Sequence, residues 1–159
     1  MIAALLLLGW MCLIFSLSAE SAEESSKTSR GTILWLVKTF SSGFEELSPE
    51  MQEAQVESLQ FFVRKAAHFS LYGGLGFFAF LAVITYTRLW YRVRMLIGAS
   101  FCLLYAIGDE IHQLFVSGRS GEVRDVLIDF CGAISGILIT AAIARLIKPI
   151  YRTVRYHEK

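Results

Sequence analysis

Four long apolar stretches constrain the fold of this chain more than any other feature. They are residues 1–17, 66–87, 95–116 and 126–147. Each approaches the ~20 residues that an α-helix needs to cross the hydrocarbon layer of a membrane. None contains a proline, so each can keep an unbroken ladder of backbone hydrogen bonds in lipid. The sequence therefore predicts an all-α fold, an integral membrane bundle of about four transmembrane helices.

Composition and charge narrow the class of protein further. The chain has 159 residues, of which 55% are hydrophobic, and its mean hydropathy is +0.53. A soluble domain of this size rarely carries so many apolar residues, because it has to cover its own surface with polar side chains. The net charge of +1 gives no indication of a nucleic-acid partner. We therefore expect membrane lipids to be the surroundings and the partners of this chain.

Basic residues predict how the chain is oriented. The segment between the second and third stretches contains Arg88, Arg92 and Arg94 and no acidic residue. Short basic loops stay in the cytoplasm, so this segment and the C-terminal tail should both lie inside. The tail carries Lys148, Arg152, Arg155 and Lys159. We therefore expect a multi-pass protein of the cell membrane with both termini in the cytoplasm and with residues 18–63 and 117–125 outside.

The first stretch, residues 1–17, is the shortest of the four. It ends near Ser16-Leu17-Ser18-Ala19, which is similar to a signal-peptide cleavage site. No basic residue precedes the apolar run, however, whereas a signal peptide normally has a basic region there. An uncleaved helix is therefore expected.

Residues 18–63 are predicted to form the outer loop of a single membrane domain that covers residues 1–159. Residues 20–30 are polar and rich in serine, which indicates a mobile connection. Apolar residues then recur at helical spacing and predict an amphipathic helix in the membrane interface: Ile33, Leu36, Val37, Phe40, Phe44 and Leu47. Ser48 and Pro49 are typical of a helix start, with Ser48 as the N-cap. We expect this helix to run straight into the second stretch.

The second stretch opens with three polar residues on one helical face. Lys65, His68 and Tyr72 are at positions i, i+3 and i+7, so their side chains point the same way. A snorkelling lysine and a tyrosine in an aromatic belt are common in membrane proteins, and both explain their residues without a function. His68 lies one turn deeper than Lys65 and has no such explanation.

The third stretch interrupts its apolar pattern near its end. Asp109 and Glu110 are adjacent carboxylates, although a charge at the centre of a membrane helix costs ~2.5–3.5 kcal/mol on insertion scales. His112 and Gln113 follow within one turn, and we expect Asp109, His112 and Gln113 to share a face. The expected partners of the two carboxylates are Lys65, Arg119 and Arg124.

The fourth stretch begins with two carboxylates, Asp125 and Asp129, which are four residues apart. A carboxylate at a helix N-terminus is favoured by the helix dipole, which accounts for Asp125 but not for Asp129. Gly132 and Gly136 continue the same stripe as a GxxxG pattern. Such small residues let another helix approach closely.

On the expected topology these polar residues meet at the outer face of the membrane. Chance would scatter such interruptions, whereas a shared polar site requires them at one depth. The candidate catalytic residues are His68, Tyr72, Asp109, Glu110 and His112. The candidate substrate-binding residues are Lys65, Gln113, Arg119, Arg124, Asp125 and Asp129.

The motifs together resemble the VanZ family. The resemblance is carried by Arg64-Lys65-Ala66-Ala67-His68, by Asp109-Glu110-Ile111-His112-Gln113, and by Gly118-Arg119-Ser120-Gly121 followed by Asp125 and Asp129. It covers nearly the whole chain, although the basic residues expected before the first helix are missing. Members are multi-pass proteins, mostly of Gram-positive bacteria, and the family is named for a member associated with low-level resistance to the glycopeptide teicoplanin. The resemblance implies a place in the cell envelope and not a particular reaction.

Two functions fit such a site. The first is an enzyme, a hydrolase or a transferase, that acts on an amphiphilic or lipid-linked envelope molecule. Cationic side chains would hold a phosphate or carboxylate, a histidine would act as general base, and Tyr72 would donate a proton or stabilise an oxyanion. The second is a protein that binds an anionic lipid headgroup or an amphiphilic antibiotic without converting it.

The sequence identifies no cofactor and leaves further accounts open. A metal site is one, with its ligands drawn from His68, Asp109, His112, Asp125 and Asp129. Another is a buried ion-pair network that only fixes helix packing. An ion or proton carrier is disfavoured, because the inner halves of the stretches have no matching polar groups.

Overall fold

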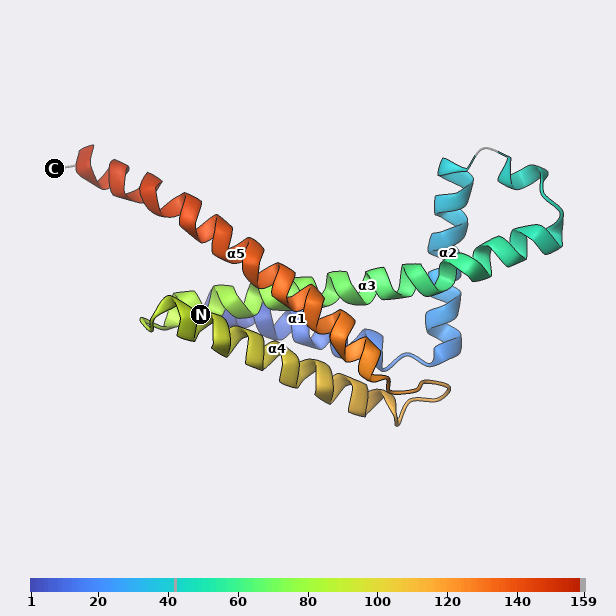
Figure 1. Cartoon of the computed structure of the whole chain (residues 1–159), viewed down its shortest axis with the longest axis horizontal. Coiled ribbons are helices and arrows are strands. Elements are labelled where there is room, and N and C mark those ends of the chain that lie inside the picture. The colour runs from blue at the N-terminus through green and yellow to red at the C-terminus, as the bar shows by residue number, and fades with distance from the viewer. Residues whose placement is uncertain (42, 158–159) are drawn as a thin grey trace.

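The computed structural model describes residues 1–41 and 43–157, with side chains described as far as Ile147. The regular structure of these residues is helical throughout. In chain order the elements are α1 (Ile2–Ser18), α2 (Ala22–Phe40), the short 3₁₀-helix η1 (Phe44–Glu46), α3 (Pro49–Tyr86), α4 (Tyr91–Gln113) and α5 (Val123–His157). In Figure 1, α1, α3 and α4 run alongside one another and α5 crosses them, while α2 stands across one end of this bundle.

Three of the helices are long and apolar enough to cross a membrane: α3, α4 and the part of α5 from Val123 to Ile147. A fourth span is obtained if α1 and α2, which are bent by 104° at the break between them, count together. The outer surface agrees with a lipid environment, since Leu104 and Leu146 are 69% and 70% exposed. The prediction of an all-α membrane bundle with about four spans is confirmed.

The start of α3 is where the sequence places a helix start. Ser48 is the N-cap and its hydroxyl accepts a hydrogen bond from the backbone N–H of Met51 at 3.4 Å, while Pro49 takes the first helical position. The helix then continues without a break to Tyr86. The outer helix and the second span are therefore one element, as predicted.

The prediction of a mobile connection over residues 20–30 is wrong, because most of this segment belongs to α2. Ser21 caps the helix: its hydroxyl accepts from the N–H of Glu24 at 3.3 Å, and the Glu24 carboxylate accepts from the N–H of Ser21 at 3.0 Å. This reciprocal pair satisfies N–H groups that a helix start otherwise leaves free. A polar, serine-rich segment is therefore helical here.

The apolar stripe over residues 33–47 is not one helix either. The helix α2 ends at Phe40, and Gly43 has a φ of +93°, a conformation that suits glycine and turns the chain into η1. The inner part of the stripe packs on α3, since Ile33, Val37 and Phe44 form a buried cluster with Val56. The stripe thus holds α2 and η1 against the outer part of α3.

Glycines bring α3 and α5 into backbone contact. A Cβ atom on Gly136 would lie 1.8 Å from the carbonyl oxygen of Gly73, and one on Gly132 would lie 2.2 Å from that of Phe69. On the other side of the contact, a Cβ on Gly76 would lie 2.0 Å from the carbonyl oxygen of Ala133. The predicted close approach at the GxxxG pattern is confirmed, and its partner is α3. This contact fixes which residues of α3 and α5 face each other at both ends of the bundle.

The helix α1 is an integral part of the bundle. Its Ile14 is buried in a core cluster with Leu75 of α3 and Cys102 of α4. Trp10 donates its indole N–H to the carbonyl of Leu71 at 2.8 Å. These contacts place the C-terminal end of α1 beside the polar residues of α3 and α4.

Candidate functional site

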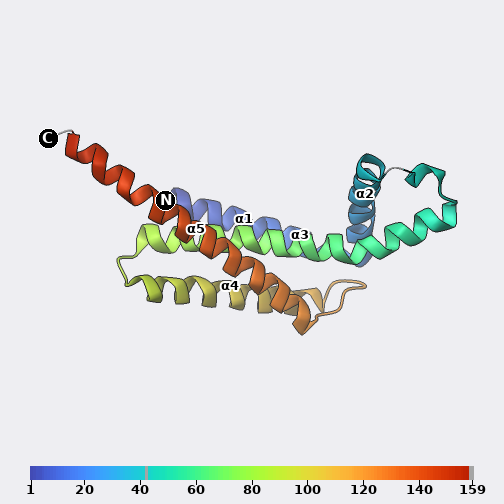
Figure 2. The ribbon, with the colours of Figure 1, turned by 45° about the horizontal axis from the view of Figure 1, so that its top comes forward.

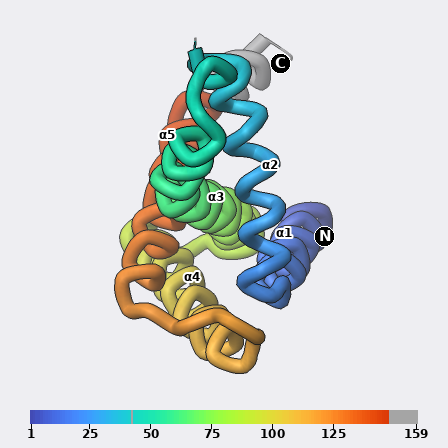
Figure 3. The backbone as a smooth tube through the Cα atoms, turned by 90° about the vertical axis from the view of Figure 1, so that its right-hand side faces the viewer, coloured from blue at the N-terminus to red at the C-terminus, as the bar shows by residue number. Residues whose placement is uncertain are grey.

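The polar residues of α3, α4 and α5 meet at the end of the bundle that α2 covers. The end-on view in Figure 3 shows α2 standing beside α3, with α1, α4 and α5 around them. The middle of α3 enters here, and the C-termini of α1 and α4 and the N-terminus of α5 lie nearby. Residues that are far apart in the sequence therefore contact each other at this end.

His68 of α3 and Asp129 of α5 form the innermost pair of opposite groups. The Nδ1 atom of His68 lies 3.4 Å from Oδ1 of Asp129, within ion-pair distance. The Asp129 side chain is fully buried, and neither of its oxygens has a hydrogen-bond partner among the described residues. A buried carboxylate without a partner is costly, so a proton shared with His68 is the compensation that the site offers.

Lys65 and Asp125 form the second pair, one helical turn nearer the end of the bundle. The ammonium group of Lys65 contacts both carboxylate oxygens of Asp125. Each side chain is only 16% exposed, so the ion pair is largely shielded from water. Lys65 also lies over the ring of Phe61, at 5.4 Å from its centroid. Most of its charge is thus already compensated inside the protein.

Asp109 is the acceptor of a buried hydrogen-bond cluster. Its Oδ2 atom accepts from the hydroxyl of Ser18 at 2.7 Å, from the hydroxyl of Tyr72 at 3.0 Å and from the amide of Gln113 at 3.4 Å. All four side chains are buried. The expectation that Asp109 pairs with a cation is wrong, because neutral donors surround this carboxylate. Tyr72 is likewise engaged, since its O–H donates to Asp109.

Glu110 and His112 lie on other sides of α4. The Oε2 atom of Glu110 accepts the backbone N–H of Glu122 at 2.9 Å, which ties the α4–α5 loop to α4 and is not the expected cation partner. His112 stacks on Phe15 of α1 at a centroid distance of 4.6 Å. Neither residue lines the cavities described below. Of the candidate residues on α4, Gln113 lines the smaller of these cavities.

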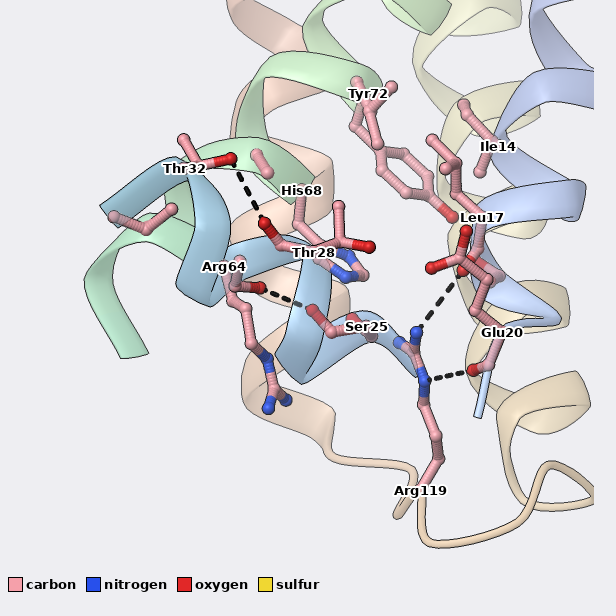
Figure 4. Close-up of a pocket in the computed structure, with 15 residues that line it drawn as sticks. Ile14, Leu17, Glu20, Ser25, Thr28, Thr32, Arg64, His68, Tyr72 and Arg119 are labelled. Carbon is pink, nitrogen blue, oxygen red and sulfur yellow. Dashed lines mark hydrogen bonds between the residues drawn. The ribbon is translucent and has the colours of Figure 1, made fainter. Parts of the chain in front are cut away.

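Arg119 connects the α4–α5 loop with the end of α1. Its guanidinium donates to the carbonyl of Glu20 at 3.0 Å and to that of Leu17 at 3.3 Å, as the dashed lines in Figure 4 show. Burial, and next the positive charge of Arg64, lower the pKa of Arg119, and nearby carboxylates only partly offset this. Arg119 is therefore a cation that an additional anion would stabilise.

Arg124 lies apart from these groups. It is exposed, pairs with Glu122 at 3.0 Å and covers the ring of Phe61 at 5.1 Å. An exposed pair of this kind contributes little to stability. The structure therefore places Arg124 beside the site and not in it.

Two cavities adjoin at this end and share Arg64, His68 and Arg119 in their walls. The larger, of about 240 Å³, lies between α1, α2 and α3 and has apolar walls that include Ile14 and Leu71. The smaller, of about 90 Å³, is the polar one, with walls drawn also from Lys65, Gln113, Ser120 and Asp125. Figure 4 shows the His68 ring and both arginines around the larger cavity. Because Nδ1 of His68 faces Asp129, its Nε2 atom is the one available to a ligand.

Several residues of this site were missed at the level of the sequence. Arg64 appeared only as part of a motif, yet it lines both cavities. Ser18 bonds to Asp109 across 91 positions, and Ser25 and Thr28 of α2 form part of a cavity wall. The capping box at Ser21 was the signal that would have predicted the helix α2.

The five candidate metal ligands do not meet in one place. Within the described part of the chain, no group of three or more histidine, cysteine, aspartate or glutamate side chains is arranged to hold a metal ion. Of the five, His68 and Asp129 are within ion-pair distance of each other. The donor set of this structure therefore fits a proton-sharing pair.

Comparison with known proteins gives a family. A model of the family described as VanZ/LLP1 matches residues 3–145, which include every residue that lines the two cavities. No curated protein and no solved structure matches the chain.

Proposed function

Since the chain belongs to the VanZ/LLP1 family, we propose that it acts on an amphiphilic or lipid-linked molecule of the cell envelope. Arg64 and Arg119 bind an anionic group of this substrate, and His68 transfers a proton during a hydrolase or transferase reaction. Asp129 orients the imidazole ring and stabilises its protonated form. A role in teicoplanin resistance, which the family name suggests, is part of the same proposal.

The position of His68 is the observation that carries the proposal. Its Nδ1 atom faces a buried carboxylate, and it lines both cavities together with Arg64 and Arg119. A histidine whose Nδ1 faces a carboxylate is held in one orientation, with Nε2 free to take a proton. Arg119 keeps guanidinium N–H groups beyond the two that it donates to Glu20 and Leu17. Arg64 is in no ion pair among the described residues, so both arginines offer the donors that phosphate and carboxylate groups prefer.

The chemistry follows from these three side chains. For a phosphate ester, the arginines hold the phosphoryl oxygens while a water molecule attacks phosphorus. The proton of this water passes to Nε2 of His68 as the new oxygen–phosphorus bond forms. The bond to the leaving group then breaks, and its oxygen takes the proton from the imidazolium; the leaving group is an alcohol for a monoester and the polyprenyl phosphate for a polyprenyl diphosphate. Asp129 stabilises the imidazolium between these two steps.

An orientation with this site at the outer face of the cell membrane and with both termini in the cytoplasm is part of the proposal. The basic segment of Arg88, Arg92 and Arg94 lies at the opposite end of the bundle, where short basic loops indicate the cytoplasm. The tail residues Lys148, Arg152, Arg155 and Lys159 support the same orientation by sequence alone, since their side chains lie outside the described residues. The 104° bend after α1 lets α2 lie along the outer surface, where the exposed Trp35 and Phe40 would face the headgroups.

Binding without conversion is the second candidate. The hydroxyl groups of Ser29 and Thr32, both in the cavity wall, donate to carbonyls of their own helix at 2.7 and 3.2 Å. The hydroxyl of Ser70, close to His68 in the sequence, does the same at 2.7 Å. Among the described residues no hydroxyl of the cavity wall is hydrogen-bonded to His68. The absence of such an activated hydroxyl favours either water as the nucleophile or a site that only holds an anionic headgroup or an amphiphilic antibiotic.

The test uses vesicles that contain a polyprenyl diphosphate as the probe. The purified protein and its His68→Gln, Asp129→Asn and Arg64→Gln variants are compared, with His112→Gln as the control outside the cavities. Conversion is followed by phosphate release and by mass spectrometry of the lipid, and binding is measured in parallel. For an enzyme, His68→Gln should lower the rate by about 10²–10⁴-fold, the usual contribution of a general base. Its binding should be unchanged, and His112→Gln should match the wild type.

The outcomes separate the two candidates. Binding without conversion, weakened by Arg64→Gln and little affected by His68→Gln, would support the binding protein. Neither binding nor conversion of the diphosphate lipid or of teicoplanin by correctly folded protein would contradict both.

A further inference from the structure

A large cavity lies at the other end of the bundle. It is a groove of about 720 Å³ between the C-terminal part of α3, the N-terminal part of α4 and α5. Figure 2 shows the α3–α4 turn and the later part of α5 at the end that faces away from α2. The walls of the groove are mainly apolar and include Phe80, Ile84 and Ile143. Two arginines, Arg94 and Arg145, also line it. The volume falls within the range of about 300–1,000 Å³ that is usual for small-molecule sites.

The two arginines have no counter-charge within the protein. The sequence contains no aspartate or glutamate between Glu57 and Asp109, nor between Asp129 and Glu158. Over the part of the chain with described side chains, neither arginine takes part in an ion pair. An anion that balances them has to come from outside.

Each arginine is held in a position that suits an anion in the groove. The Nε atom of Arg94 is buried and has no hydrogen-bond partner among the described residues. The guanidinium of Arg145 lies 4.7 Å from the ring centroid of Tyr91, another groove residue. A buried N–H of a charged group that lacks a partner is costly, and a phosphate oxygen would satisfy it with a charge-assisted hydrogen bond.

We propose that this groove binds one anionic phospholipid, with its phosphate between Arg94 and Arg145 and an acyl chain along the apolar walls of α3 and α5. The combination of a buried, unpartnered guanidinium N–H with a long apolar groove fits a lipid better than a free phosphate, which would leave the apolar walls uncovered. The inference concerns a site at the far end from His68 and does not rest on the function proposed above.

Arg92 offers a matched control, because ordinary contact with membrane headgroups is the competing account. Any arginine at a membrane surface meets lipid phosphates. Arg92 is exposed, lies two positions from Arg94 and does not line the groove. If surface contact alone held the lipid, replacing Arg92 or Arg94 would therefore reduce lipid binding equally. A site in the groove requires Arg94 and not Arg92.

The experiment is native mass spectrometry of the full chain in detergent with an equimolar mixture of phosphatidylglycerol and phosphatidylcholine that have identical acyl chains. We expect one phosphatidylglycerol to be retained in preference to phosphatidylcholine. Arg94→Gln and Arg145→Gln should each weaken this retention by about tenfold, as expected when a charge-assisted contact is lost. Arg92→Gln should retain the lipid like the wild type. Glycerol 3-phosphate, added in excess, should not displace it.

A second variant guards against the possibility that the arginine variants fail to fold. Ala144→Trp fills the groove and leaves every charge in place, so it should abolish the retention of phosphatidylglycerol while the helical circular dichroism stays unchanged. Equal retention of the two lipids by the wild type would overturn the proposal. So would equal losses in Arg92→Gln and Arg94→Gln, retention by Ala144→Trp, or displacement by glycerol 3-phosphate, which would indicate a site for phosphate alone.

Discussion

The two ends of the bundle differ in whether their charged side chains have partners of opposite charge within the protein. At the α2 end, Lys65 meets Asp125 and His68 meets Asp129, so cations and carboxylates compensate each other inside the protein. At the α3–α4 turn, Arg94 and Arg145 face a groove with no carboxylate among the described residues. A protein can hold charge in a membrane by pairing it internally or by taking the partner from the lipid. At the α2 end the internal pairs supply a proton-transfer group beside Arg64 and Arg119, which are left to bind a substrate anion. At the other end the two arginines line their groove, whose described walls contain no acidic side chain.

Disrupting the glycine contact between α3 and α5 should have the largest effect on stability. Gly136 touches the backbone of α3, so the side chain in Gly136→Leu has no space and should force the helices apart. We expect a loss of at least about 3 kcal/mol in the free energy of unfolding, the upper end of the usual cost of overpacking. Thermal unfolding in detergent measures it. Gly9→Leu is the control, because a Cβ there meets nothing within 4 Å, and an equal loss in both variants would refute the account of the contact.

The Asp109 cluster tests whether neutral donors hold the α2 end together. Asp109→Ala leaves the buried hydroxyls of Ser18 and Tyr72 without their acceptor. The expected loss in the free energy of unfolding is about 1–3 kcal/mol, the cost of leaving buried polar groups unsatisfied. Denaturant titration measures it, with the exposed Glu122→Ala as control. If the two variants were equally stable, the cluster would have no structural importance.

A smaller effect should distinguish the internal ion pair from a surface one. A double-mutant cycle of Lys65→Ala and Asp125→Ala should give a coupling energy of about 1–2 kcal/mol, because the pair is largely shielded from water. The cycle of Arg124→Ala and Glu122→Ala, an exposed pair, should give less than about 1 kcal/mol. Equal coupling energies would mean that the α2 end does not shield its charges as described.

The smallest effect concerns the attachment of α2. Arg30 of α2 donates to Glu53 of α3, and this hydrogen bond holds the pKa of Glu53 below its ordinary value. A lowered carboxyl pKa means that its stabilisation is present above the ordinary pKa and is lost as the pH falls through the lowered one. Hydrogen exchange of α2 should therefore accelerate in acid, beyond the change in intrinsic exchange rate. In Glu53→Gln it should be fast already at neutral pH, and an α2 with the same protection in both proteins would argue against this attachment.

The features that could be predicted from the sequence are those that depend on residues within a single helix. Ser48 and Pro49 mark the start of α3, the spacing of Gly132 and Gly136 indicates a helix contact, and both depend on residues a few positions apart. The gathering of polar residues at one end could be predicted as well, because three apolar stretches are interrupted at a similar depth.

The partners within the site could not be predicted, since they depend on how the helices rotate against one another. Asp109 was expected to meet a cation, yet its donors are Ser18, Tyr72 and Gln113. Ser18 lies in another helix, and no local pattern links it to Asp109. The helix α2 is a different case, because Ser21 and Glu24 form a capping box that is visible in the sequence and was outweighed by the polar composition around it.

The most direct test of the contrast between the two ends compares the binding of two lipids, a polyprenyl diphosphate and phosphatidylglycerol. Native mass spectrometry measures the binding of each to the wild type, Arg64→Gln and Arg94→Gln. Arg64 lines both cavities beside His68, and Arg94 lines the groove at the other end. The account predicts that Arg64→Gln loses the diphosphate lipid and keeps phosphatidylglycerol, while Arg94→Gln does the reverse. If both variants lost both lipids to the same degree, or neither lost any, the two ends would not be separate anion sites and the central claim would be contradicted.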